Sequence, residues 1–150
     1  MELILWRHAD AEMTAPDLGR ELTEVGRKQA ARVAGWLTPR LPPDIRILAS
    51  PAARAIQTAQ ALGRTYEVID ALAPGASAEL VLGAAGWPDA DYPVMIVGHQ
   101  PTLGQIASRL LCGQARELTV KKGGIWWFQG RGRADELHVV LRAVAAPDWL

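Results

Sequence analysis

Residues 3–11, with the sequence LILWRHADA, decide how the rest of the chain is interpreted. Four apolar residues (3–6) run directly into Arg7 and His8. A short, wholly apolar run is typical of a strand that helices cover on both faces. In open α/β sheets, ligands bind beyond the carboxyl ends of the strands. This stretch therefore predicts a buried strand that delivers a guanidinium and an imidazole to a place where a ligand can bind.

Length and composition limit the class of protein. The 150 residues suit a single domain spanning residues 1–150, and the 49% that are apolar suffice for one sizeable core. A formal net charge of zero gives no support to binding of nucleic acid or of a membrane surface. Cys112 is the single cysteine, so an intramolecular disulfide and a cysteine-based zinc site are excluded. We expect a cytoplasmic protein without a signal peptide or a membrane span, because the N-terminal apolar run is too short for either.

Beyond the first strand, short apolar runs alternate with helical patterns. Strands are predicted at residues 45–49, 66–69 and 93–97, and helices at residues 24–37, 51–62, 77–85 and 102–111. The last part of the chain predicts strands at residues 118–120, 125–128 and 137–141, joined by glycine-rich and basic turns. This order predicts an α/β fold, a three-layer α/β/α sandwich with a largely parallel mixed sheet.

Two hydroxyl residues are expected to cap helices. Thr23 precedes the first helix, and Ser50 precedes Pro51 at the start of the second. Proline suits the first position of a helix, so we interpret Ser50 as the N-cap of the second helix. The first helix is expected to bury one stripe of apolar residues, made of Ala30, Val33, Ala34, Leu37 and Leu41.

Three of the predicted strands end near residues that bind anions. The first ends in Arg7-His8, the second is followed by Arg54, and the strand at residues 93–97 leads into Gly-His-Gln-Pro, which contains His99. Taken alone, Arg7 is explained by a surface salt bridge and Gly-His-Gln-Pro by a tight turn. Arg54 is harder to explain, because the helix dipole favours acidic residues in the first turn unless an anion binds there. The convergence of these residues on one rim of the sheet favours an anion site.

Two arginines and two histidines around one point suit a phosphoryl group. Guanidinium forks match phosphoryl oxygens and keep their charge. One neutral imidazole can attack phosphorus while the other donates to the oxygens, and nearby cations are expected to lower the pKa of the central histidine. Phosphoryl transfer depends mainly on positioning and charge neutralisation. The sequence has no acidic cluster with metal-binding spacing, so we expect neither a metal nor an organic cofactor.

Four segments resemble the histidine phosphatase superfamily: LILWRHADA, RELTEVGRKQAARVAGWL, ILASPAARAIQTAQAL and VMIVGHQPTLGQIASRLL. The short chain and the Arg-His-Ala-Asp-Ala opening look most like the SixA-type phosphohistidine phosphatase branch of that superfamily. The resemblance covers roughly residues 1–112 and, more loosely, the tail. It implies a phosphoglycerate mutase-like fold, hydrolase activity and a role in signal transduction.

The resemblance also implies roles for individual residues. His8 would be the nucleophile that becomes phosphorylated. Arg7 and Arg54 would bind the phosphoryl oxygens, and His99 would donate to the same oxygens. Arg20, within the segment RELT, is a further candidate for binding substrate in this pocket.

The chain departs from the family pattern in two places. Where the family usually has glycine after Arg-His, this chain has Ala9. Alanine costs about 1 kcal/mol if the turn needs a positive φ, and otherwise narrows the pocket slightly. Many larger members have a glutamate proton donor after the third strand, whereas Glu79 is the sole carboxylate of residues 74–86 here. We interpret Glu79 as a solvated surface residue in preference to a catalytic acid. Asp10 is the other candidate proton donor.

The lack of a clear acid favours one class of substrate. An alkoxide leaving group needs an acid, whereas the imidazole of phosphohistidine is protonated near neutral pH and leaves already neutral. We therefore expect a phosphatase that acts on phosphohistidine in a protein partner, such as a phosphotransfer domain. A small-molecule phosphomonoesterase for sugar or nucleotide phosphates, and a phosphate-binding module without turnover, are the alternatives.

Overall fold

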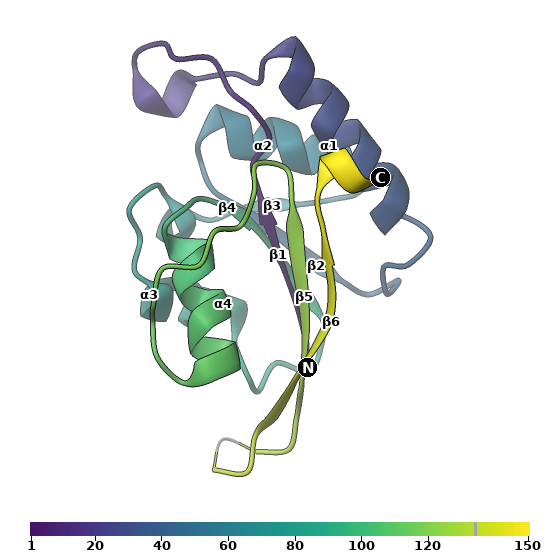
Figure 1. The fold of residues 1–150 in the computed structure, drawn as a ribbon, viewed down its shortest axis with the longest axis vertical. Coiled ribbons are helices and arrows are strands. Elements are labelled where there is room, and N and C mark those ends of the chain that lie inside the picture. Colours follow the sequence, from purple (N-terminus) through teal and green to yellow (C-terminus); the bar gives the residue numbers. More distant parts are fainter. Residues whose placement is uncertain (134) are drawn as a thin grey trace.

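The computed structural model describes residues 1–133 and 135–150, in which one sheet carries helices on both faces (Figure 1). The strands are β1 (Glu2–Arg7), β2 (Arg46–Ala49), β3 (Glu67–Val68), β4 (Val94–Gly98), β5 (Ile125–Arg131) and β6 (His138–Ala145). The helices are α1 (Glu24–Leu37), α2 (Ala53–Gln60), α3 (Ala78–Ala85) and α4 (Thr102–Cys112). Short 3-10 turns are η1 (Asp17–Gly19), η2 (Asp70–Leu72) and η3 (Pro147–Trp149).

The order of the strands, β3-β2-β4-β1-β5-β6, places β1 inside the sheet. Strands β1 to β4 run parallel, and Arg7 at the end of β1 lies opposite Gly98 at the end of β4. Strand β5 is antiparallel to β1, and β6 is antiparallel to β5. The predicted mixed, largely parallel sheet is therefore confirmed. Its topology brings the carboxyl ends of β1, β2 and β4 together at one edge.

The side chains of β1 alternate between two cores. Ile4 and Trp6 pack in the core that contains α1 and α2, whereas Leu3 and Leu5 pack in the core that contains α3 and α4. All four side chains are fully buried, as expected for a strand covered on both faces. Figure 1 shows α3 and α4 together on one side of the sheet. Arg7 therefore extends from a strand whose other side chains are packed on both faces of the sheet.

The first helix follows its predicted pattern. The Thr23 hydroxyl accepts the N–H of Gly26 at 2.9 Å, which confirms the N-cap. All members of the predicted stripe are buried: Ala30, Val33, Ala34, Leu37 and Leu41. Within the described residues, no helix has the length and apolar character that crossing a membrane requires.

Two predictions about local structure are wrong. Ser50 is not the N-cap of α2, because Ala52 occupies the N-cap position and the helix starts at Ala53. The Ser50 hydroxyl instead accepts the N–H of Ala52 at 3.1 Å and contacts a histidine. Residues 118–120 form no strand. Two of their carbonyls accept hydrogen bonds from the side chains of Gln100 and Arg7 in place of a strand partner.

Candidate active site

The sheet topology gathers the predicted site residues from three adjacent strands. Arg7 ends β1 and His8 follows it, His99 follows β4, and Arg54 lies in the first turn of α2 just after β2. The His8 N–H donates to the Gly98 carbonyl at 3.0 Å, which extends the β1–β4 pairing by one residue. The two imidazole rings lie with their centroids 5.2 Å apart. The structure therefore brings His8, Arg7, Arg54 and His99 to one edge of the sheet.

The hydrogen bond that His8 makes determines which of its nitrogens can act as a nucleophile. The ring is 7% exposed, and Nδ1 lies 2.7 Å from the Ala9 carbonyl oxygen. Because a carbonyl only accepts, Nδ1 must carry the proton in this contact. In a neutral ring, Nε2 then holds the lone pair. His8 is thus set with one nitrogen tied to the backbone and the other available to attack.

Ala9 occupies the turn without backbone strain. No residue other than glycine has a positive φ in residues 1–133 or 135–150, so the cost considered for a left-handed alanine does not arise. The Ala9 N–H donates to the Thr58 hydroxyl at 3.1 Å, and that hydroxyl donates to the Arg54 carbonyl at 2.7 Å. Thr58 therefore ties the turn after His8 to the helix that carries Arg54.

The turn formed by residues 121–124 braces the end of β1 from the other side. The Gly123 N–H is shared between the carbonyls of Arg7 and His8, at 3.1 Å from each. Gly123 has φ +70°, a conformation that favours glycine. The Trp6 indole N–H donates to the Gly123 carbonyl at 2.9 Å. These contacts fix the backbone that presents the guanidinium and the imidazole.

Both histidines are neutral at physiological pH. Burial lowers the pKa of His8 to about 4, the hydrogen bond to Ala9 opposes this, and the charges of Arg54 and Arg7 lower it further. Burial also lowers the pKa of His99 to about 3, with smaller contributions from His8 and Arg54. The sequence suggested cations as the cause for the central histidine, but burial contributes more. Neutral His8 keeps the lone pair that attack on phosphorus requires.

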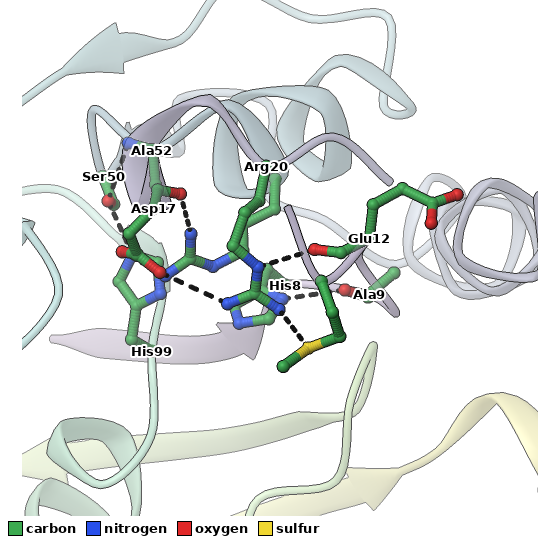
Figure 2. Close-up of polar contacts among 10 residues, drawn as sticks. His8, Ala9, Glu12, Asp17, Arg20, Ser50, Ala52 and His99 are labelled. Carbon is green, nitrogen blue, oxygen red and sulfur yellow. Dashed lines mark hydrogen bonds and ion pairs between the residues drawn. The ribbon is translucent and has the colours of Figure 1, made fainter. Parts of the chain in front are cut away.

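Ser50 holds His99 in place. Its hydroxyl oxygen lies 2.7 Å from His99 Nε2, and it also accepts the N–H of Ala52 (Figure 2). The other ring nitrogen, Nδ1, is buried and has no hydrogen-bond partner among the described residues. Since the Ala52 N–H already occupies an acceptor position of Ser50, the hydroxyl proton is free to point at Nε2. His99 can then present an N–H from Nδ1.

The two arginines differ in how their charges are used. Arg7 donates from one terminal nitrogen to the Val120 carbonyl at 2.9 Å, and its Nε is buried without a partner among the described residues. Arg54 donates with both terminal nitrogens to Asp17, at 2.8 Å to the main-chain oxygen and 3.2 Å to the carboxylate. The Arg54 guanidinium is therefore already paired with an anion of the protein itself.

Asp17 was not predicted as part of the site. It lies in η1, in the loop after β1, and one carboxylate oxygen contacts Arg54 while the other lies 3.3 Å from an Arg20 terminal nitrogen. Figure 2 shows the contact between its carboxylate and Arg20. Arg20 also donates from Nε to the Glu12 carbonyl at 2.6 Å. No spacing pattern pointed to Asp17, although a cluster of arginines generally requires an anion nearby.

The two candidate proton donors are both held as carboxylates. Asp10 accepts from Lys122 at 2.9 Å and from the Thr23 hydroxyl at 2.7 Å, and these contacts keep its pKa below the usual range. Glu79 pairs with Arg109 on the exposed face between α3 and α4, and that guanidinium lowers its pKa. In the described chain, no hydrogen bond or ion pair links Glu79 to the histidines. Neither carboxyl is poised to donate a proton.

Comparisons with known proteins point to one family of enzymes. A model of the histidine phosphatase superfamily (branch 1) matches residues 3–74. An uncharacterized protein of Picosynechococcus sp. (strain PCC 7002) is 34% identical over all of this chain and 99% of its own length. The phosphohistidine phosphatase SixA of Escherichia coli is 29% identical over 76% of each chain. The solved structure of a SixA-type protein from Nakamurella multipartitia superposes with a TM-score of 0.81 at 28% identity, covering 97% of this chain and 95% of that one.

The chain belongs to the histidine phosphatase superfamily and is a phosphatase. Within the superfamily it falls in the SixA-type branch, as the E. coli and Nakamurella relatives show. The predicted phosphoglycerate mutase-like fold is confirmed as well. A phosphoserine phosphatase from Entamoeba histolytica shares it with a TM-score of 0.71 at 19% identity, over 97% of this chain and 96% of that one.

Proposed function

We propose that this phosphatase removes phosphate from phosphohistidine in a protein, through a covalent intermediate on His8. The observation that carries the proposal is the state of the carboxyls considered as proton donors. Asp10, Asp17 and Glu79 each have a cationic partner that lowers their pKa. None of them is a ready acid for an alkoxide leaving group. A protonated imidazole leaves as a neutral molecule without such an acid.

The first step forms a new bond between phosphorus and His8. The lone pair of His8 Nε2 attacks phosphorus in line with the bond to the substrate nitrogen. That bond breaks, its electron pair returns to the substrate ring, and the ring leaves as neutral imidazole. The Ala9 carbonyl stabilises the positive charge that develops on His8, because its oxygen accepts a hydrogen bond from Nδ1–H at 2.7 Å.

Three side chains would hold the transferring oxygens. Arg7 and Arg54 supply charged donors, and each has a buried Nε without a partner in the described chain. His99 supplies the Nδ1–H, provided that Ser50 donates to Nε2. If the tautomer were reversed, a lone pair would face the phosphoryl oxygens and repel them. Ser50 is therefore assigned as a positioning residue that acts through His99.

The second step releases phosphate. Water attacks phosphorus on phospho-His8, the bond to Nε2 breaks, and the electron pair returns to the ring. The proton lost by water ends on the phosphate or in solvent, so no carboxylic acid is consumed. His8 returns to the neutral state that its burial favours.

The comparisons support this substrate class. The E. coli relative is a phosphohistidine phosphatase. A protein histidine phosphatase SixA with the same fold was solved in complex with tungstate, an oxyanion similar to phosphate in shape. A protein that carries phosphohistidine, such as a phosphotransfer domain, is the partner we propose.

Rapid quenching tests the proposal. The protein is mixed with a ³²P-phosphohistidine protein and quenched in alkali or in acid within the first turnover. We expect label on the phosphatase that survives alkali, is lost in acid, and is absent from His8→Asn. His138→Asn is the matched control, because this third histidine is exposed on β6 and should leave the labelling unchanged.

Each other outcome points to a different function. Full turnover by His8→Asn would refute the covalent mechanism. Faster hydrolysis of a sugar or nucleotide phosphate than of the phosphohistidine protein would make the chain a small-molecule phosphomonoesterase. Binding of phosphate with no hydrolysis of any phosphoramidate or ester would leave a phosphate-binding module.

A further inference from the structure

Asp17 holds the cations that a phosphoryl group needs. We propose that it is an internal ligand of the phosphoryl site, which every incoming phosphoryl group must displace from Arg54. The inference rests on the proposed function only in that this site binds phosphoryl groups. In this inference, Asp17 controls the access of anions to the site. Neither the fold nor the chemistry of the histidines requires such control.

The contacts of Asp17 imitate those of a bound oxyanion. One carboxylate oxygen lies 3.2 Å from Arg54 and the other 3.3 Å from Arg20, so a single carboxylate bridges two guanidinium groups. The carboxylate also lies near enough to His99 to raise the pKa of that ring, against the effect of burial. A tetrahedral anion touching Arg54 and His99 would need the space and the hydrogen-bond donors that Asp17 now uses.

The loop is attached in a way that permits the exchange. Its base is closed by a bridge between Ala11 and Leu22 and by the Glu12 N–H, which donates to the Glu21 carbonyl at 2.8 Å. Its tip, residues 13–19, is exposed along its whole length. The hydrogen bonds that the tip makes outside the loop, as far as the structure describes the chain, all go to Arg54. Within the described chain, lifting the tip therefore breaks two hydrogen bonds outside the loop, both donated by Arg54, and a phosphoryl group can replace them.

Burial of Arg54 explains why an internal ligand is useful. The Arg54 side chain is 5% exposed, and a buried guanidinium without a counter-charge is strongly unfavourable. The Asp17 side chain is 57% exposed, so it returns to water at little cost when it leaves. Asp17 thus stabilises the pocket by pairing with Arg54. It also lowers the apparent affinity for phosphate, because only molecules in which Asp17 has left Arg54 can bind the anion.

Binding of inorganic phosphate, measured by isothermal titration calorimetry on the whole chain, tests the inference without any turnover. We expect Asp17→Asn and Asp17→Ala to bind phosphate about tenfold more tightly than the original chain, since each removes the competing charge. Asp44→Asn is the matched control. It removes one exposed negative charge just before β2, at the opposite end of the sheet, and should leave the affinity unchanged.

The results separate this inference from the proposed function. Unchanged or weaker phosphate binding by both Asp17 variants, with clear binding by the original chain, would overturn the inference and leave the phosphoryl site intact. Lack of phosphate binding by every protein would remove the phosphoryl site itself, and both proposals with it. Amide hydrogen exchange gives a second measurement on the original chain. Exchange in residues 13–19 should rise on saturation with phosphate, and equal or greater protection would contradict the displacement of the tip.

Discussion

The end of the sheet and the loop after β1 hold their charged groups in different ways. His8, His99 and Arg54 are almost fully buried and are fixed by the turn at Gly123, by Ser50 and by Thr58. The loop tip is exposed, and its hydrogen bonds to the rest of the described chain run through Asp17. Packing of the sheet therefore fixes the groups that act on phosphorus, whereas in our proposal one carboxylate governs whether an anion occupies the site. Changes at the sheet end should therefore alter catalysis strongly.

The largest effect is expected for the nucleophile. His8→Asn removes the attacking nitrogen, and turnover of a phosphohistidine protein should fall by about 10,000-fold or more. Steady-state phosphate release measures this, with His138→Asn as the control that keeps its activity. A similar loss of turnover in both variants would indicate a general effect of removing histidine. It would contradict a specific role for His8.

The next effect is expected for the buried guanidinium. Arg54→Lys keeps the charge but loses the planar fork, so kcat/KM should fall by about 100-fold. The same substitution at Arg40, which lies after α1 and donates to the Trp36 carbonyl, should have no effect on catalysis. Retention of activity by Arg54→Lys would show that a point charge suffices and that the fork is not used.

A smaller effect is expected for the residue behind His99. Ser50→Ala removes the donor to His99 Nε2, and kcat/KM should fall by about tenfold, the usual effect of one lost hydrogen bond. Nitrogen-15 NMR of the ring distinguishes this role from simple packing. The original chain should show the proton of neutral His99 on Nδ1, and Ser50→Ala should shift it toward Nε2. A proton on Nε2 in the original chain would contradict the assigned tautomer.

The buried histidines should also make stability depend on pH. Their pKa values are about 4 and about 3 in the fold and about 6.5 when unfolded, so the unfolded chain binds protons first as pH falls. Their contribution is complete above pH 6.5 and is lost as pH falls toward 4 and then 3. Each pKa unit corresponds to about 1.4 kcal/mol of unfolding free energy.

Urea unfolding at pH values between 7 and 4 measures this dependence. His8→Asn should lose less stability over that range than the original chain, because it lacks one of the two groups. His138→Asn should lose as much as the original chain. Identical pH profiles for all three proteins would show that burial of His8 does not favour its neutral form.

The smallest effect is expected where the chain departs from its family. Ala9 is fully buried and has no positive φ, so glycine is not needed there. Ala9→Gly should reduce the free energy of unfolding by about 1 kcal/mol through a lost methyl contact and greater backbone freedom, with activity within about twofold. Thermal unfolding and phosphate release measure the two quantities. A large gain in activity would mean that the methyl group narrows the pocket.

Much of the fold was predictable because its signals are local. The apolar runs at residues 3–6 and 93–97 mark buried strands, and the stripe from Ala30 to Leu41 marks the buried face of α1. The strand predicted at residues 118–120 was wrong. A short apolar run does not reveal that the side chains of Gln100 and Arg7 donate hydrogen bonds to its carbonyls. Such long-range hydrogen bonds leave no periodic pattern in the sequence.

The site was predictable in its centre and not in its surroundings. Strand ends and motif order indicated His8, Arg7, Arg54 and His99, because parallel strands bring their carboxyl ends together. The role of Ser50 depends on a histidine that follows a different strand. That of Asp17 depends on how a loop folds back over a helix, which composition and spacing do not encode.

A crystal structure with bound tungstate tests the central claim most directly, because it shows what the gathered strand ends bind. We expect the oxyanion within hydrogen-bond distance of Arg7, Arg54 and His99, with tungsten facing His8 Nε2 and Asp17 moved off Arg54. An anion bound elsewhere, or one that faces a His8 ring turned to present Nδ1, would contradict the account.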